Sequence, residues 1–171
     1  MAQQTLSAKK IAIMVAANFD ETQFINIQKA MMASNAWLKV VSNKSGLVNG
    51  AKDGMLGMAY PVDALLSETL AIDYDALIIP GGAKHIATLA QEPHAIRILR
   101  AFMREEMPVL FIDDATSLLG EAGSDITDSD FGDDAVSAVK HVVKANADAS
   151  LTEALALLAE AFTASDEEQA A

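Results

Sequence analysis

Apolar residues along the chain follow two alternating patterns. Short continuous apolar runs bounded by turn residues are typical of buried strands, whereas apolar residues recurring every three or four positions indicate helices. The runs predict strands at 10–17, 36–42, 76–79 and 108–113, with a further strand within 138–143. The helical pattern covers 22–34, 84–90, 93–106, 115–121 and 150–164. This alternation predicts an α/β fold with a mainly parallel central sheet and helices on both faces.

Several predicted helices carry start signals. Asp20 or Thr22 suits the N-cap of the helix at 22–34, and Pro93 suits the first turn of the helix that it opens. Ser150, followed three positions later by Glu153, forms part of a capping box for the last helix.

The segment 43–63 interrupts the alternation. Its sequence, NKSGLVNGAKDGMLGMAYPVD, has turn signals at 44–46, at Asn49-Gly50 and at Asp53-Gly54. These signals predict an excursion with two short strands near 46–49 and 55–59. A short helix is expected next, in LLSETL.

The length of 171 residues suits one domain. We predict a flexible tail at 1–8, one domain over 9–164 and an acidic tail at 165–171. The acidic, turn-rich segment 123–134 is expected to be an exposed loop.

Composition narrows the function. The net charge of −12 argues against nucleic acid and anionic membrane surfaces, both of which require basic patches. The absence of cysteine excludes disulfides and thiol catalysis. No secretory signal or membrane span is evident, so we expect a cytoplasmic protein.

Polar residues follow three of the predicted strands. In open α/β sheets, sites form beyond the carboxyl ends of the strands, so these residues should be neighbours. They are Asp20, Glu21, Gln23, His85, Asp113 and Asp114. Gly81-Gly82 lies at the same edge and has two interpretations: N–H donors for an anionic group, or simply a tight strand-to-helix turn, which we favour.

His85 and the Asp113-Asp114 pair each have a functional and a structural interpretation. His85 suits acid–base chemistry or metal binding, but a single histidine beside scattered carboxylates favours a structural role. The two aspartates suit a proton-sharing pair or a nucleophile, but no matching lysine and magnesium site is visible. We therefore favour Asp113 as a former nucleophile position and Asp114 as the cap of the next helix. We expect no metal site and no cofactor.

Three motifs resemble the ThiJ/PfpI superfamily: KIAIMVAANFDETQ, YDALIIPGG and PVLFIDDATSLL. The resemblance implies a flavodoxin-like three-layer sandwich of the glutamine-amidotransferase type. It places Asp113 where active members have the elbow cysteine, Asp114 at the histidine that follows, and Gln23 at the supporting glutamate. The cysteine-dependent protease, deglycase and glyoxalase activities should therefore not carry over.

The chain resembles most closely the C-terminal domain of large-subunit catalases, which also lacks the elbow cysteine. That resemblance implies stress-related, chaperone-like behaviour without haem, and the superfamily implies a homodimer. We therefore expect a non-catalytic accessory or binding protein whose partner is a second copy, a catalase or unfolded client proteins. The alternative is a small-ligand binder or hydrolase-type enzyme that uses a polar cleft. Its candidate residues are Asp20, Gln23, Gly81, Gly82, His85 and Asp113.

Overall fold

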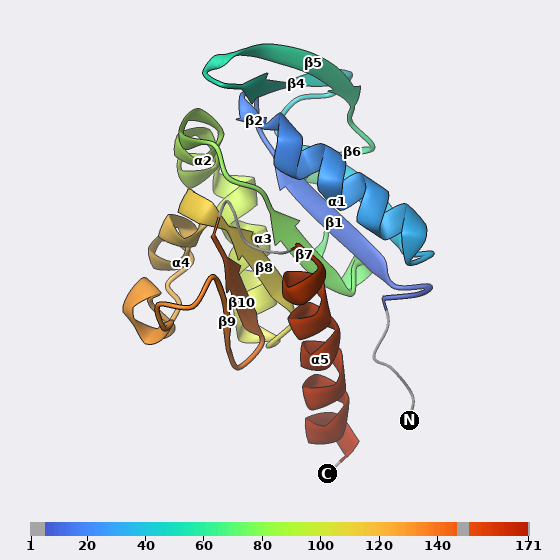
Figure 1. Cartoon of the computed structure of the whole chain (residues 1–171), viewed down its shortest axis with the longest axis vertical. Coiled ribbons are helices and arrows are strands. Elements are labelled where there is room, and N and C mark those ends of the chain that lie inside the picture. Colours follow the sequence, from blue (N-terminus) through green and yellow to red (C-terminus); the bar gives the residue numbers. More distant parts are fainter. Residues whose placement is uncertain (1–5, 147–150, 171) are drawn as a thin grey trace.

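A computed structural model describes residues 6–146 and 151–170, and within the last helix the side chains up to residue 162. Its centre is a seven-stranded sheet in the order β6-β3-β1-β7-β8-β10-β9 (Figure 1). All neighbouring strands are parallel except the last pair, β10 and β9. The strands are β1 (Lys10–Val15), β3 (Trp37–Ser42), β6 (Ala64–Leu65), β7 (Ala76–Ile79), β8 (Val109–Ile112), β9 (Val136–Val139) and β10 (Val142–Ala145).

The central strands are buried because helices cover both faces of the sheet. In Figure 1, α1 and α5 lie in front of the sheet and α3 lies behind it. Alternate residues of β1 accordingly enter two different cores: Ile11 and Ile13 pack with α1 and α5, and Ala12 and Met14 pack with α2, α3 and α4. The predicted three-layer α/β sandwich is confirmed. The helices are α1 (Glu21–Ala33), α2 (Ala83–Ala90), α3 (Pro93–Arg104), α4 (Leu118–Glu121) and α5 (Leu151–Ala170).

The excursion pairs with a short strand before α1 to form a second, three-stranded sheet in the order β2-β4-β5. Its strands are β2 (Phe19–Asp20), β4 (Leu47–Lys52) and β5 (Met55–Pro61). The predicted Asp53-Gly54 turn joins β4 to β5, and both residues have the positive φ that such a tight turn requires. Asn49-Gly50, also a predicted turn, instead lies inside β4, where the register with β5 shifts.

Three predicted elements differ from the structure. The segment 138–143 contains a hairpin rather than one strand: β9 and β10 pair across Lys140, a non-glycine residue with positive φ. Residues 115–121 form a 3₁₀ helix, η3 (Asp113–Ser117), followed by the short α4. LLSETL contributes only the single turn of η1 (Leu66–Glu68), and η2 (Ala71–Asp73) follows it.

The structure describes part of each predicted tail. Residues 1–5 of the predicted N-terminal tail, and the predicted cap Ser150, lie outside the described residues, but Leu6 is buried beside α5. Helix α5 runs on to Ala170 through most of the predicted acidic tail. No helix in the described part of the chain is both long and apolar enough to cross a membrane.

Candidate functional site: a closed elbow

The sharp turn after β8 keeps the geometry of a nucleophile elbow. Asp113 directly follows Ile112, the last residue of the strand, and adopts φ of +56°. This left-handed conformation strains most residues but is tolerated by aspartate, whose short side chain bonds locally. The turn therefore holds the exposed Asp113 side chain beyond the carboxyl end of the sheet.

The glycine turn after β7 lies against this elbow. A Cβ built on Gly81 would lie 3.0 Å from Asp114 Oδ1, 3.1 Å from Asp113 Cβ and 3.3 Å from Gln23 Oε1. Gly82, with φ of +130°, packs against the backbone of Asn18 and leaves no room for a side chain. These contacts support the tight-turn interpretation: a Cβ at Gly81 would crowd three side chains, and Gly82 excludes a side chain altogether.

Both N–H groups of the glycine pair bond within the protein. The Gly81 N–H donates to Gln23 Oε1 at 2.7 Å, and the Gly82 N–H donates to Asp114 Oδ1 at 2.9 Å. These donors are the ones that the sequence offered to an anionic group. Because an amide oxygen and a carboxylate oxygen already accept from them, the site is closed on itself.

This arrangement corrects the role predicted for Asp114. Its carboxylate accepts from Gly82 across the site, and neither η3 nor α4 has a side-chain cap. Asp20, in contrast, caps α1 as one of the two expected residues, with Oδ1 accepting from the Gln23 N–H at 2.9 Å. The structure thus brings together Gln23, the glycine pair and the two elbow aspartates. Asp20 lies beside them: its carboxylate caps α1, and its N–H donates to Gly81 O at 2.8 Å.

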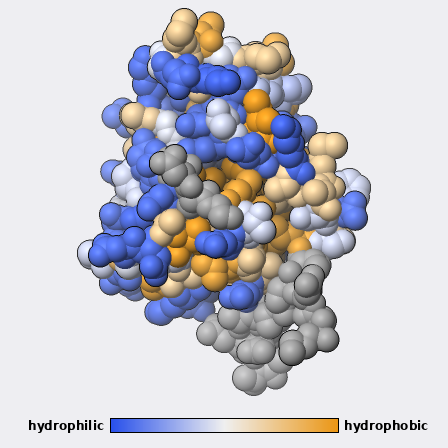
Figure 2. Space-filling model, in the orientation of Figure 1, coloured by the Kyte–Doolittle hydropathy of each residue, from blue (hydrophilic) through white to orange (hydrophobic). Residues whose placement is uncertain are grey.

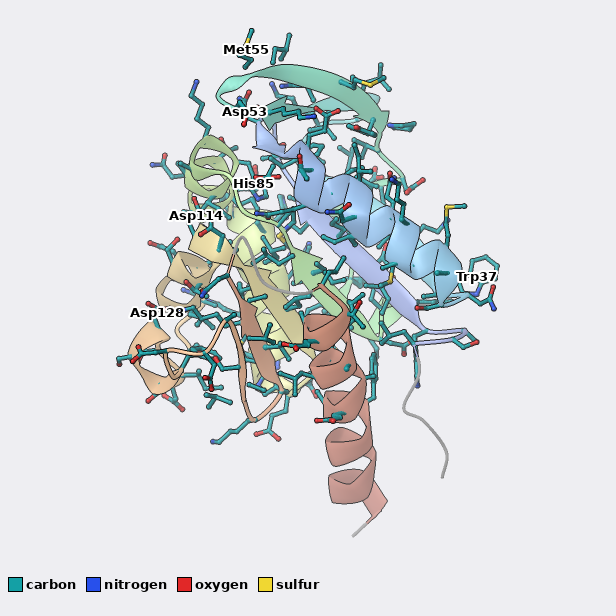
Figure 3. The ribbon with its side chains drawn as sticks, in the orientation of Figure 1. Trp37, Asp53, Met55, His85, Asp114 and Asp128 are labelled. Carbon is teal, nitrogen blue, oxygen red and sulfur yellow. The ribbon has the colours of Figure 1, made fainter. Side chains whose placement is uncertain are left out.

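His85 is fully buried in the core (Figure 3), whereas the Asp113 side chain is exposed. Its Nδ1 accepts from the Ala16 N–H at 3.0 Å, so the proton lies on Nε2, which donates to Pro80 O at 2.7 Å. Burial lowers the pKa of His85 to about 4, although the Pro80 hydrogen bond and the Asp114 charge oppose this shift. A neutral imidazole with both nitrogens engaged supports the structural interpretation.

A buried glutamate joins the site to the excursion. Glu21 is 6% exposed, and its Oε1 accepts from the Tyr60 hydroxyl at 2.7 Å and from the Met58 N–H at 3.4 Å. Gly57 approaches the Glu21 carboxylate more closely than a Cβ would permit. Burial, the hydrogen bond to Glu21 and the Glu21 charge raise the pKa of Tyr60 to about 12. The hydroxyl therefore stays protonated and donates to Glu21.

The sequence pattern places Glu21 near the site but indicates no role for Glu21 or Tyr60. The usable signal was Gly57, a glycine inside a strand, which often marks the close approach of another group. Among the described residues, no group of three or more histidine, aspartate or glutamate side chains could hold a metal ion.

Known proteins share this fold. The DJ-1 of Schizosaccharomyces pombe aligns with a TM-score of 0.70 at 16% identity, over 95% of this chain and 99% of that one. A ThiJ/PfpI domain protein from Brachyspira murdochii aligns with a TM-score of 0.70 at 18% identity, over 92% of this chain and 98% of that one.

A sequence relative is General stress protein 18 of Bacillus subtilis (strain 168), 29% identical over 111 residues. The match covers 65% of this chain and 63% of that protein, so the chain spans under two thirds of the relative's length. The family model described as DJ-1/PfpI matches residues 9–127, which include α1, the glycine turn and the elbow. The chain therefore belongs to the DJ-1/PfpI family.

Proposed function

We propose that this protein is a non-catalytic binding or accessory member of the DJ-1/PfpI family. The observation that carries the proposal is the closed elbow: Asp113 follows β8 at the turn where the resemblance places the nucleophile, and Gln23 and Asp114 accept from the glycine N–H groups. A carboxylate lacks the nucleophilicity of a thiolate, and a glutamine amide cannot serve as a general base. The chain has no cysteine that could replace the missing thiol.

The exposed edge of the excursion offers a surface for partners. Strand β5 is the outer strand of its sheet, and its sequence MLGMAYP contains no charged residue. Met55, Leu56 and Met58 on β5 are exposed, and Figure 2 shows apolar residues gathered at this end of the molecule. An uncharged apolar edge strand invites pairing with another chain. A homodimer is our first choice, and a catalase or unfolded client proteins are the alternatives.

Two observations support a role in stress: the name of a sequence relative and, more weakly, the motif resemblance. The Bacillus subtilis relative is named as a general stress protein. The weaker support is the resemblance of the sequence motifs to the catalase C-terminal domain, which implies stress-related behaviour. We propose that this chain likewise acts under stress, in the cytoplasm, by holding a partner rather than by turning over a substrate.

The test of self-association is sedimentation velocity over a hundredfold range of protein concentration. We expect a dimer that a charge on β5 dissociates, because an edge lysine opposes strand pairing. Leu56→Lys is the variant and Met32→Lys the control, since both side chains are 79% exposed but Met32 lies on α1. A monomer at every concentration, or equal effects of the two variants, would rule out this edge as the dimer interface.

The same two variants test the client-binding alternative. A heat-labile client protein is heated with the chain, and light scattering reports its aggregation. If β5 holds unfolded clients, the wild type suppresses scattering, Leu56→Lys suppresses it less and Met32→Lys matches the wild type. If the wild type does not suppress scattering, the chaperone-like role is ruled out.

The catalase alternative is tested by adding purified large-subunit catalase to the sedimentation runs.

A second candidate function is small-ligand binding at the elbow, favoured by the exposed Asp113 on its retained turn. Asp20, Gln23 and the glycine pair would be its neighbours at this edge of the sheet, and the buried His85 would support the turn through Pro80. A thermal shift screen against metabolites tests it, because a ligand at 100 times its Kd should add roughly 2.7 kcal/mol of stability. A flat screen would count against this candidate.

A further inference from the structure

All three arginines of the chain lie on one helix. Arg97, Arg100 and Arg104 have the spacing i, i+3 and i+7 on α3, which places them along one side of that helix. The other permanently cationic side chains are all lysines, and the chain as a whole has a net charge of −12. Arginine is the residue of choice for holding carboxylates, because its planar fork donates two parallel hydrogen bonds.

Arg97 holds the neighbouring loop, which contains η1 and η2, against this helix. Its guanidinium donates to the carbonyl oxygens of Leu66 and Thr69, each at 3.0 Å. These bonds tie the loop that contains η1 and η2 to α3. The loop nevertheless leaves large apolar side chains in water: Leu70 is exposed, and Ile72 is 83% exposed.

A cavity of about 550 Å³ lies between this loop and α3. Its apolar lining includes Leu70, Ile72, Ala101 and Met107. Its charged lining consists of Arg97, Arg104 and Glu105. A largely apolar hollow of this size with a few charged groups has the make-up of a small-molecule site.

A second, smaller cavity lies on the other side of Arg104. It has a volume of about 260 Å³, and its lining includes Arg100, Arg104 and Lys140 together with the carboxylates of Glu106 and Asp125. Arg104 lines both cavities, so its guanidinium lies between the larger, mainly apolar cavity and the smaller cavity with three cationic side chains.

Arg104 is available for a new partner. Its Nε lies 3.1 Å from Oε1 of the neighbouring Glu105, but the two side chains are 70% and 60% exposed. An ion pair this exposed contributes little and exchanges readily. Arg100 makes no hydrogen bond or ion pair with the described residues.

We propose that this groove binds an anionic amphiphile, namely a single-chain carboxylate with an aliphatic tail. The tail covers Leu70, Ile72 and Met107, and the carboxylate replaces Glu105 as the partner of Arg104, next to Arg100. The net charge of −12 disfavours the surface of an anionic bilayer, which favours a free amphiphile. Met107 precedes β8 and Asp113 follows it, so the groove lies at the opposite end of the strand from the elbow. The proposal is independent of the proposed function.

The test is isothermal titration calorimetry of the full chain with dodecanoate, kept below its critical micelle concentration. We expect saturable binding at one site per chain, with dodecanol and dodecyltrimethylammonium binding at least tenfold more weakly. Binding that is equally tight for all three compounds, or absent below the micelle concentration, would overturn the proposal.

Two exposed substitutions locate the site without disturbing the core. Arg104→Gln and Ile72→Ser should each weaken dodecanoate binding at least tenfold. The matched controls, Lys29→Gln and Met32→Ser on α1, should leave it unchanged. Binding that survives both groove variants, or falls equally with the controls, would place the ligand elsewhere and contradict the proposal.

Discussion

His85 is buried in its neutral form. Because protonation of a buried imidazole is unfavourable, the free energy of unfolding depends on pH. Its pKa falls from the ordinary 6.5 to about 4 on folding, so the unfolded chain binds an extra proton between these values. The stabilisation is complete above pH 6.5 and is lost progressively as the pH falls to about 4. The loss is on the order of 3 kcal/mol when complete.

Urea unfolding of the wild type and His85→Gln between pH 7.5 and 4.5 measures this effect. We expect His85→Gln to be the less stable protein at pH 7.5, because glutamine cannot reproduce both hydrogen bonds. Its stability should also fall less steeply on acidification. Parallel curves for the two proteins would show that His85 does not carry the pH dependence.

The backbone of Asp113 should govern which residues its position tolerates. A φ of +56° costs a residue with Cβ about 1–2 kcal/mol, and most for a β-branched side chain. Asp113→Val should therefore be less stable than Asp113→Gly by about 1–2 kcal/mol in urea unfolding. Equal stabilities would mean that the turn relaxes to negative φ in the variants.

Asp114 keeps the glycine turn occupied, so its removal should open the site. In Asp114→Ala the Gly82 N–H loses its acceptor and becomes available to an added anion such as acetate. Chemical shifts of the Gly82 amide should then respond saturably to acetate in the variant but not in the wild type. An equal response in both proteins would show that the wild-type site is not closed.

The sequence predicted which residues gather at the site but not how they bond. Asp20, Gln23, the glycine pair and the elbow aspartates follow strands that end at one edge, so topology alone brought them together. The hydrogen-bond acceptors of the Gly81 and Gly82 N–H groups come from other loops at that edge, and no local sequence pattern indicates which side chains extend far enough to meet them. Glu21 and Tyr60 are 39 residues apart, and their contact depends on how the excursion folds back.

At the scale of elements, the excursion is anchored to α1 by glycines. Gly57 packs against the Glu21 carboxylate and the Gly50 carbonyl, so Gly57→Ala should displace a buried hydrogen-bonded group. We expect a loss of about 1–3 kcal/mol, as for overpacked sites. The control is Gly120→Ala in α4, where a Cβ would meet nothing within 4 Å and helix propensity should make the change neutral or slightly stabilising.

Hydrogen exchange of the excursion provides the more local readout. In Gly57→Ala the amides of β4 and β5 should exchange faster than in Gly120→Ala, while those of β1 stay protected. Unchanged protection of the excursion, with wild-type stability, would mean that Glu21 does not anchor it.

Elements defined by burial were predictable, and elements defined by tertiary contacts were not. The continuous apolar runs of β7 and β8 identify strands covered on both faces. The β9–β10 hairpin was not predicted because its turn uses Lys140 rather than glycine, and η3 was not predicted because its apolar spacing also suits an α-helix. Surrounding packing imposes both departures on sequences without a local signal.

At the scale of the whole molecule, the sequence predicts the fold, but the fold does not determine the function. Two cores on opposite faces of one sheet and the family motifs define a DJ-1/PfpI architecture, and the motifs made that fold predictable. The same architecture here carries Asp113 after β8 and no cysteine in the sequence, and a shared fold does not by itself imply a shared activity. The partner was not predictable because no local sequence pattern records which exposed surface pairs with another chain.

The most direct test of the central claim is an assay of glyoxal and peptide turnover, with a cysteine-bearing family member as the positive control and Asp113→Ala beside the wild type. A closed elbow without a nucleophile predicts no turnover above buffer for either form of this chain. Robust wild-type turnover that disappears in Asp113→Ala would contradict the account and make Asp113 a catalytic residue.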